Sequence, residues 1–283
     1  MVEVLKPGFY ASIQDYGRFG YQQYGVPYSG VMDRRAAGLA NSILGNEEDA
    51  AVIEMTMTGA VLRFESETYI CIAGADMSPK LNEVQISLYK SIKIQVGDVL
   101  SFGKLNTGFR CYLAVFGGFK TENIMRSQSM CKGITNVFNI SKSDKFKISV
   151  NTSFSINKNA SIKVKNDYIK TKIIKVFKGP EFDLLSKKQQ EFLLKTEFTV
   201  SKDNNRMAYQ LVEPLENNLE PIITSAVLPG TVQLTPSGKL IILMRDCQTT
   251  GGYPRVLQLK ETAINTIAQK ITGNSVNFSL SEF

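Results

Sequence analysis

The residues best suited to chemistry gather in one segment near the C-terminal end of the chain. This segment reads Arg245-Asp246-Cys247-Gln248-Thr249-Thr250-Gly251-Gly252-Tyr253-Pro254 and follows the most apolar run, Leu240–Met244. A strand that delivers an acid, an amide and two hydroxyls into one loop concentrates hydrogen-bonding groups at a fixed point. Asp246 would serve there as a general acid or base, and Gly251 and Gly252 would offer backbone amides to an anion. The alternative is that the acid and the threonines hydrogen-bond within their own turn.

A second glycine-rich region lies near the N-terminus and combines acidic, basic and hydroxyl side chains. It comprises Gln14-Asp15-Tyr16-Gly17-Arg18-Phe19-Gly20-Tyr21 and Gly25-Val26-Pro27-Tyr28-Ser29-Gly30-Val31-Met32-Asp33. Glycines let the backbone approach a ligand closely, and Arg18 would grip a carboxylate or phosphate with two hydrogen bonds. The alternative is a turn-rich β connection in which Asp15 and Arg18 form an ion pair.

Two further features carry less chemistry. Thr235-Pro236-Ser237-Gly238 favours a turn, because each of these residue types suits one. Cys247 is a poor nucleophile candidate, since the carboxylate of Asp246 beside it would raise the pKa of its thiol. The four cysteines (Cys71, Cys111, Cys131 and Cys247) are widely spaced without a CxxC pair, and we interpret them as small apolar residues with reduced thiols.

Composition excludes several classes of protein. The chain of 283 residues contains no histidine, which excludes Ser-His-Asp and Cys-His nucleophilic sites and zinc bound by histidine. No Walker loop, no GxGxxG dinucleotide loop and no Ala-Met-Lys-Met biotin-attachment sequence is present. No apolar run reaches the ~20 residues of a membrane helix, and no signal peptide is visible, so we expect no membrane association and a cytoplasmic location.

The positive charge is concentrated in one stretch. Lys and Arg number 33 against 26 Asp and Glu, which gives a net charge of +7. Nine lysines and only two acids lie between Asn139 and Lys175, so the rest of the chain is neutral. These lysines stand mostly among Ser, Asn and Ile, which predicts a solvated segment and no nucleic-acid partner.

Most apolar segments predict short strands between turn residues, which is typical of barrels or sandwiches. The predicted strands are 69–73, 92–96, 99–102, 111–116, 231–235, 240–244, 255–259 and 276–280. Three helices are also predicted: one capped by Asp33 and ended by Gly45, one from Gly179-Pro180-Glu181 to about Leu194, and one from about Glu261 to Lys270.

The two halves of the chain contain similar segments in the same order. Asp15 to Gln22 aligns without gaps on Asp203 to Gln210, and Gly97 to Phe102 aligns on Gly273 to Phe278. The shared order favours two related β units, with the lysine-rich excursion between them.

The motifs together resemble the biotin-dependent carboxyltransferase family, also called the allophanate hydrolase subunit 2 family. The resemblance rests on the N-terminal glycine-rich region and its continuation through Leu44-Gly45-Asn46, and on the segment from Asp246 to Pro254. It extends through Ala50 to Glu54, Ala73 to Asp76, Ser127-Gln128-Ser129, Arg206 to Tyr209, Gln233 and Pro236-Ser237-Gly238. Asn205, Cys247 and Arg126 depart from the family pattern, which usually has Asp, Arg and Gly there.

The resemblance implies a mainly β fold with a few helices, built as two cyclophilin-like β-barrel units. Their expected extents are 1–138 and 173–283, separated by a Lys/Asn/Ser-rich excursion at 139–172. Three roles occur in the family: the C subunit of a bacterial ATP-dependent 5-oxoprolinase, a carboxyltransferase acting on carboxybiotin and a urea-like amide, and a regulatory subunit that binds a kinase inhibitor. The short chain favours the first role, with ATP and Mg bound in a complex with the B subunit (the subunit 1 protein of the family) and the A subunit. No biotin would be attached to this chain.

The resemblance also implies site residues, and no metal ligand is expected among them. Asp246 is the expected catalytic acid or base. The expected substrate-binding residues are Arg18, Arg206, Tyr209, Gln248, Thr249, Thr250, Gly251 and Gly252. Further candidates are Asp15, Ser29, Asp33, Glu54, Asp76 and Ser237.

Overall fold

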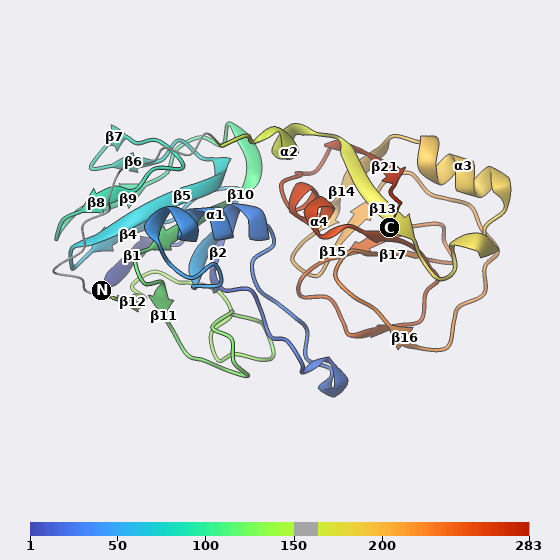
Figure 1. Cartoon of the computed structure of the whole chain (residues 1–283), viewed down its shortest axis with the longest axis horizontal. Coiled ribbons are helices and arrows are strands. Elements are labelled where there is room, and N and C mark those ends of the chain that lie inside the picture. The colour runs from blue at the N-terminus through green and yellow to red at the C-terminus, as the bar shows by residue number, and fades with distance from the viewer. Residues whose placement is uncertain (150–163, 283) are drawn as a thin grey trace. The chain divides into compact units, whose positions relative to one another are not determined.

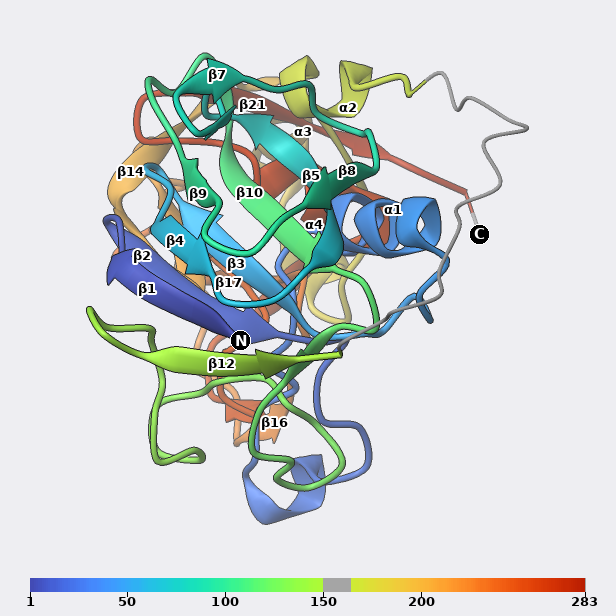
Figure 2. The ribbon, with the colours of Figure 1, turned by 90° about the vertical axis from the view of Figure 1, so that its left-hand side faces the viewer.

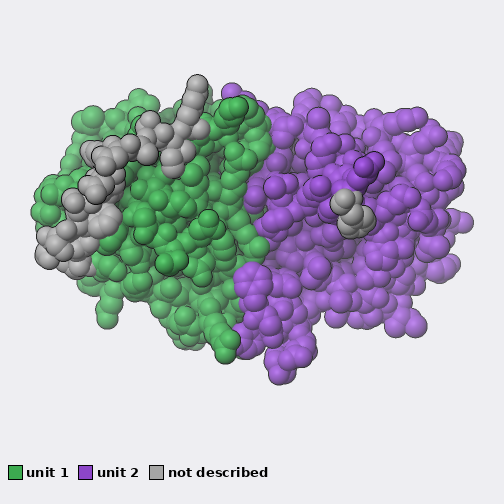
Figure 3. Space-filling view, in the orientation of Figure 1, with its two compact units in different colours: residues 1–18, 29–169 green, residues 19–28, 170–283 purple. Residues whose placement is uncertain are grey.

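The computed structural model describes residues 1–149 and 164–282, and the chain divides into two compact units (Figure 3). Unit 1 comprises Met1–Arg18 and Ser29–Ile169, and unit 2 comprises Phe19–Tyr28 and Lys170–Phe283. Much of the expected excursion at 139–172 lies outside the described residues. Its described part includes a strand of unit 1. Unit 2 contains residues 170–283 together with residues 19–28, which lie within the expected extent of the first unit.

Unit 1 consists of two sheets around one apolar core (Figure 1). The seven-stranded sheet has the order β11 (Phe119–Lys120), β12 (Lys145–Ile148), β1 (Val2–Lys6), β4 (Val61–Phe64), β9 (Val99–Ser101), β6 (Lys80–Leu81) and β7 (Val84–Gln85). The five-stranded sheet has the order β2 (Tyr10–Gln14), β3 (Val52–Thr56), β10 (Thr107–Val115), β5 (Thr68–Asp76) and β8 (Ile92–Ile94). Figure 2 shows β12 alongside β1, with Val2 opposite Phe146.

Helix α1 (Arg34–Leu44) packs on the five-stranded sheet, where it contacts β5 and β10. Asp33 caps its first turn by accepting the N–H of Ala36 at 3.0 Å, and Gly45 ends it with a φ of 71°. Ala37, Ala40 and Leu44 face Tyr112 and Ala114 of the sheet in a second apolar cluster. The predicted cap and the predicted stop of this helix are both confirmed.

Unit 2 is built on a closed seven-stranded barrel. The order around the barrel is β13 (Ile173–Lys178), β20 (Arg255–Leu259), β17 (Thr231–Leu234), β18 (Leu240–Leu243), β15 (Ala208–Leu211), β14 (Phe198–Asn204) and β21 (Ser275–Leu280). The barrel closes because β13 pairs in parallel with β21, and all the other neighbours in the ring are antiparallel. A separate two-stranded ribbon joins β16 (Ser225–Ala226) to β19 (Thr250–Gly251).

The predicted mainly β fold is therefore confirmed, and every predicted strand is present with boundaries shifted by a few residues at most. The remaining short elements are η1 (Gln22–Tyr24), α2 (Asp167–Lys170), η2 (Phe182–Leu184), α3 (Lys187–Lys195) and α4 (Glu261–Ile267). The predicted third helix is confirmed as α4 and ends three residues early. No helix in the described ranges is long and apolar enough to cross a membrane.

The predicted start of the second long helix at Gly179-Pro180-Glu181 is wrong. Helix α3 begins at Lys187, because Ser186 and Gln189 form a capping box in which each side chain bonds the other residue's backbone N–H. Glu181 instead binds Arg255 with two hydrogen bonds at 3.0 and 2.8 Å. Gly179 lies where a Cβ would collide with the backbone carbonyl of Arg255, so this glycine permits close packing of two chain segments.

One of the two internal similarities seen in the sequence, Gly97 to Phe102 with Gly273 to Phe278, corresponds to a turn that occurs in both units. In unit 1, Gly97 N–H donates to Phe64 O at 2.7 Å, and Phe64 N–H donates to Asp98 O at 2.9 Å. In unit 2, Gly273 N–H donates to Val200 O at 2.9 Å, and Val200 N–H donates to Asn274 O at 2.9 Å. The side chains of Asp98 and Asn274 each accept the backbone N–H three residues earlier, at 2.8 and 3.1 Å. The repeated pattern supports the interpretation that the units are related.

Candidate functional site

The centre of the candidate site in unit 2 is an ion pair between Asp246 and Arg206. Arg206 Nε donates to Asp246 Oδ2 at 2.8 Å, and Arg206 Nη2 donates to Asp246 Oδ1 at 3.0 Å. Both side chains are mostly buried, with exposed fractions of 7% for Arg206 and 18% for Asp246. This two-point geometry fixes the carboxylate plane, so the carboxylate presents its remaining lone pairs in one defined direction.

Backbone hydrogen bonds join the two segments that carry this pair. Asp246 N–H donates to Arg206 O at 2.9 Å, and Met244 N–H donates to Met207 O at 2.8 Å. Asn205, which departs from the family pattern, accepts the N–H of Met207 at 2.7 Å through its side-chain oxygen. The asparagine therefore stabilises the turn between β14 and β15, from which Arg206 projects.

The residues that flank Asp246 hold it in place. Arg245 is 2% exposed and pairs with Glu261, the first residue of α4. Cys247 is buried, and its burial, followed by the charge of Asp246, raises the pKa of its thiol to about 12. A thiol with this pKa is not ionised near neutral pH, which agrees with the interpretation of Cys247 as a small apolar residue.

The segment 248–252 forms a loop and half of the β16–β19 ribbon. Thr249 O accepts the N–H of Val227 at 3.0 Å, and Gly252 O accepts the N–H of Ile222 at 2.9 Å. Gln248 and Thr250 are exposed. An anion-binding nest needs a residue with negative φ beside one with positive φ. Neither Gly251 nor Gly252 has a positive φ, so their backbone does not form the expected nest.

Packing explains why position 251 is a glycine. A Cβ on Gly251 would come too close to Nε2 of Gln233, a β17 residue that is 2% exposed. Gln248 Nε2 in turn donates to Gln233 Oε1 at 3.5 Å. Gln233 is thus a site residue that was absent from the expected set. Its position in an otherwise apolar strand, Thr231–Leu234, was the signal available in the sequence.

Tyr209 and Ser237 are in positions with structural roles. Tyr209 is fully buried inside the barrel, where its hydroxyl donates to Lys270 O at 3.4 Å. Ser237 lies in the predicted turn, with its hydroxyl 3.0 Å from that of Thr235 and the turn closed by Gly238 N–H donating to Thr235 O at 2.9 Å.

In unit 1, Asp15 connects the N-terminal glycine-rich region to the segment 127–129. Its carboxylate accepts the hydroxyls of Ser127 and Ser129 at 2.7 and 2.6 Å. It also accepts the backbone N–H groups of Gly17 at 2.8 Å and Gln128 at 2.5 Å. Its hydrogen-bonding capacity is therefore largely used within the protein.

Arg18 lies beside this network and is fully buried. Its guanidinium donates to the backbone carbonyls of Ile124 at 3.2 Å and Ser129 at 2.5 Å. The structure brings Asp15 and Arg18 to the same segment, although both are engaged by other groups instead of the expected Asp–Arg pair. Arg18 therefore fixes the loop 124–129 in place.

Glu54 and Asp33 are buried acids that bind the backbone where the chain enters α1. Glu54 Oε2 accepts the N–H of Met32 at 2.8 Å, and its other oxygen lies 3.8 Å from Nε of Arg110. Asp33 caps α1 and also accepts the hydroxyl of Tyr168 at 2.7 Å. Burial and the Asp33 charge raise the pKa of Tyr168, so this hydroxyl stays protonated as a donor.

Ser29 is the strained member of the N-terminal region. It is fully buried, has a φ of 56°, and its hydroxyl has no hydrogen-bond partner within the described ranges. A non-glycine residue in this conformation costs free energy, which the surrounding packing of unit 1 offsets.

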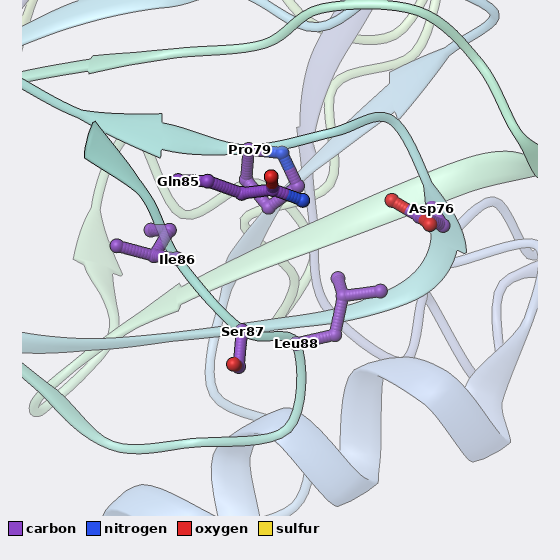
Figure 4. Close-up of a pocket in the computed structure, with 6 residues that line it drawn as sticks. All are labelled: Asp76, Pro79, Gln85, Ile86, Ser87 and Leu88. Carbon is purple, nitrogen blue, oxygen red and sulfur yellow. The ribbon is translucent and has the colours of Figure 1, made fainter. Parts of the chain in front are cut away.

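Asp76 lies on the wall of a separate pocket of about 460 Å³ in unit 1 (Figure 4). The other lining residues are Pro79, Gln85, Ile86, Ser87 and Leu88. Asp76 accepts the N–H of Ser78 at 2.9 Å and the side-chain amide of Asn106 at 3.1 Å. None of the other expected site residues lines this pocket.

Comparison with known proteins gives a consistent family assignment. A family model described as "Carboxyltransferase domain, subdomain A and B" matches residues 24–280. The C subunit of 5-oxoprolinase from Haemophilus influenzae is 28% identical over 296 residues, which cover 98% of this chain and 90% of the relative. The urea amidolyase of Lachancea kluyveri is 44% identical over 128 residues, which cover 45% of this chain and 7% of the relative.

Solved structures agree with these relatives. The crystal structure of the K. lactis urea amidolyase superposes with a TM-score of 0.87 at 27% identity, covering 98% of this chain and 18% of that one. This chain spans nine-tenths of the length of the Haemophilus relative, but about half or less of the solved chains that it matches.

Proposed function

Because the chain belongs to the carboxyltransferase domain family of subdomains A and B, we propose that it is the C subunit of a bacterial ATP-dependent 5-oxoprolinase. Together with the A and B subunits, it would open the lactam ring of 5-oxoproline to give L-glutamate. The observation that carries this proposal is the likeness to the C subunits of two 5-oxoprolinases along nearly the whole of both chains.

The reaction sets clear requirements on the site. Water adds to the lactam carbonyl carbon, the carbon–nitrogen bond breaks, and the nitrogen leaves with an added proton as the amine. A group that moves protons must lie within hydrogen-bond reach of these atoms. We assign this role to Asp246, since its carboxylate is oriented by Arg206 and is still partly exposed beside the segment 248–252.

The other expected ligands divide into two kinds. Gln248, Thr249 and Thr250 present amide and hydroxyl groups on a loop next to Asp246, and these suit orientation of an amide substrate. Arg206 is occupied by Asp246 and Arg18 by backbone carbonyls. We therefore propose that both arginines shape the loops of their own units, in place of the anion contacts expected from the sequence.

ATP and magnesium are proposed for the assembly as a whole. A magnesium–nucleotide site needs carboxylates or phosphate-binding backbone turns. Within residues 1–149 and 164–282, no group of three or more acidic, histidine or cysteine side chains is placed to hold a metal ion. We therefore assign no residue of this chain to the nucleotide or to its metal ion.

The test is an omission assay on the assembled enzyme. The chain would be purified together with the B and A subunits from the same source. Glutamate formation and ATP hydrolysis are then measured with 5-oxoproline, leaving out each protein in turn. We expect glutamate only when all three are present. A stable complex without 5-oxoproline-dependent turnover would refute the proposal and favour a regulatory binding role.

A second function is favoured by one observation. The 44% identity to a urea amidolyase over 128 residues is higher than the identity to the full-length relatives. It supports a carboxyltransferase that moves a carboxyl group from carboxybiotin on another protein to a urea-like amide. Incorporation of labelled bicarbonate into urea, dependent on a biotinylated partner, would support this function over the first.

A further inference from the structure

The side-chain amide of Gln233 is a buried donor without an acceptor. Gln233 lies in β17 of the barrel with 2% of its surface exposed, and its Nε2 has no hydrogen-bond partner within the described part of the chain. Burying an unsatisfied donor costs free energy, so such a group in a native protein calls for an explanation. The groups next to this amide indicate what it could bind.

Gln233 Nε2 lies against the backbone of Gly251, at the point where any larger residue would place its Cβ. Gly251 belongs to the loop whose Gln248, Thr250 and Tyr253 are exposed. The ribbon that holds this loop, β16–β19, is paired over only two residues on each strand. The donor is therefore covered by a short, weakly paired segment that carries the candidate substrate-binding residues.

A second carboxamide is directly beside the first. Gln248 Nε2 lies 3.5 Å from Gln233 Oε1, which is the outer limit of a hydrogen bond. Each carboxamide has two donors and an acceptor, so this one long contact leaves most of their capacity unused. Two such groups match a ligand that presents a carbonyl oxygen and an N–H on the same edge. Lactams have this edge because the ring holds the amide in the cis form.

We propose that Gln233 and Gln248 are specificity-determining residues that read the amide edge of the substrate. Gln233 Nε2 donates to the substrate carbonyl oxygen, and Gln248 Oε1 accepts the substrate N–H. The inference rests on the proposed function and specifies how the lactam of 5-oxoproline is recognised. Binding exchanges the long contact between the two glutamines for two hydrogen bonds to the ligand and satisfies the buried donor.

This assignment makes separate predictions for the two residues. The γ-lactone analogue of 5-oxoproline keeps the carbonyl but replaces the N–H by a ring oxygen. The wild-type assembly is expected to bind 5-oxoproline about 10-fold more tightly than the lactone, since the lactone leaves Gln248 without its donor. Gln248→Met removes this preference. Gln233→Met weakens both ligands together, by about 10-fold, because both carry the carbonyl.

The experiment uses the assembled enzyme and measures KM for 5-oxoproline and the inhibition constant of the lactone. Gln233→Glu is the sharper variant, because it keeps the shape and the oxygen that faces Gln248 but removes the donor. We expect it to raise KM at least as much as Gln233→Met does. A Gln233→Glu assembly with unchanged KM would overturn the assignment of Gln233 as the donor.

Gln258→Met is the matched control. Gln258 lies on the neighbouring strand β20, and its amide donates to Pro229 O at 2.9 Å and accepts from Thr231 at 2.8 Å. Its replacement should lower the melting temperature and leave KM unchanged. A wild-type assembly without any 5-oxoproline turnover overturns the proposed function, and this inference with it. An active wild type whose Gln233 and Gln248 variants keep their KM and their lactone preference overturns this inference alone.

Discussion

In the ion pair of Asp246 and Arg206, we propose that Asp246 moves protons and that Arg206 orients its carboxylate. Mutation can separate these two roles. Asp246→Asn removes the charge but keeps the shape, and we expect turnover of the assembled enzyme to fall at least about 100-fold, as for loss of a general acid or base. Arg206→Lys keeps a positive charge but not the two-point geometry, so it should lower turnover less. Steady-state kinetics on the assembly measures both.

Stability measurements provide the control for this comparison. Each variant breaks one mostly buried pair, so we expect both to lower the free energy of unfolding by about 1–3 kcal/mol in denaturant titrations. If Asp246→Asn retained full turnover despite this loss, the carboxylate would serve only the ion pair and the assignment of Asp246 would be wrong.

The cysteines give a prediction that depends on pH. Burial raises the pKa values of Cys71 and Cys247 to about 12, above the ordinary value for a thiol. A raised pKa means less thiolate at a given pH, so at pH 8 only about one such thiol in ten thousand is ionised. We expect both to resist a disulfide-exchange reagent in the native protein. All four cysteines should react once the chain is unfolded in denaturant.

Reaction of Cys247 in the native protein at pH 8, at a rate near that of a free thiol, would contradict this prediction. A Cys247→Ala variant identifies which thiol reacts.

At the scale of single residues, the sequence indicates a candidate segment but does not reveal the contacts within it. It identified the segment 246–252 because acid, amide, hydroxyl and glycine residues together are unusual after an apolar strand. It did not reveal that Arg206 and Asp246 bind each other, because they are 40 positions apart and only folding joins their segments. Gln233 was missed although it is a polar residue between apolar residues of a predicted strand, because a single residue of this kind does not by itself indicate a site.

Individual elements were predictable where their signals are local. The sequence predicts that Asp33 begins α1 and that Gly45 ends it, and the structure shows the same. Both signals are local, since the cap and the stop each act within one turn of the helix. Pro180 and Glu181 gave a similar but misleading start signal. The carboxylate of Glu181 is used by Arg255, 74 positions away, and Ser186 with Gln189 provides a stronger cap further along.

The turn shared by the two units allows a matched pair of substitutions. Gly97 and Gly273 have φ values of 91° and 83°, and a Cβ at either position would meet no atom within 4 Å. Alanine at either site therefore adds only the cost of the left-handed backbone, which is about 1 kcal/mol. We expect Gly97→Ala and Gly273→Ala to lower the free energy of unfolding by similar amounts in denaturant titrations.

A difference of more than about 2 kcal/mol between the two variants would show that the turns differ in their surroundings despite their common hydrogen bonds. Gly179→Ala is the contrasting control in unit 2. A Cβ there would collide with the backbone of Arg255, so its cost should clearly exceed that of either turn variant.

The whole molecule carries a net charge of +7 without the features of a nucleic-acid binding protein. Its excess lysines lie in one stretch of sequence, 139–175, in which most of the other residues are Ser, Asn and Ile. We therefore expect no retardation of a double-stranded DNA fragment in gel-shift experiments at 150 mM salt, with at most weak, salt-sensitive association at low salt. Sequence-dependent retention at 150 mM salt would contradict this prediction.

Unit 2 is assembled from two stretches of chain, residues 19–28 and 170–283, with all of residues 29–169 between them. During synthesis on a ribosome, its first stretch emerges early and waits until nearly the whole chain has been made. The completion of unit 2 is therefore a late event, whereas unit 1 has all of its residues once position 169 has emerged. A gene divided at position 170 would encode a second fragment that lacks part of its own unit, so separate expression of this unit requires residues 19–28 to be grafted onto it.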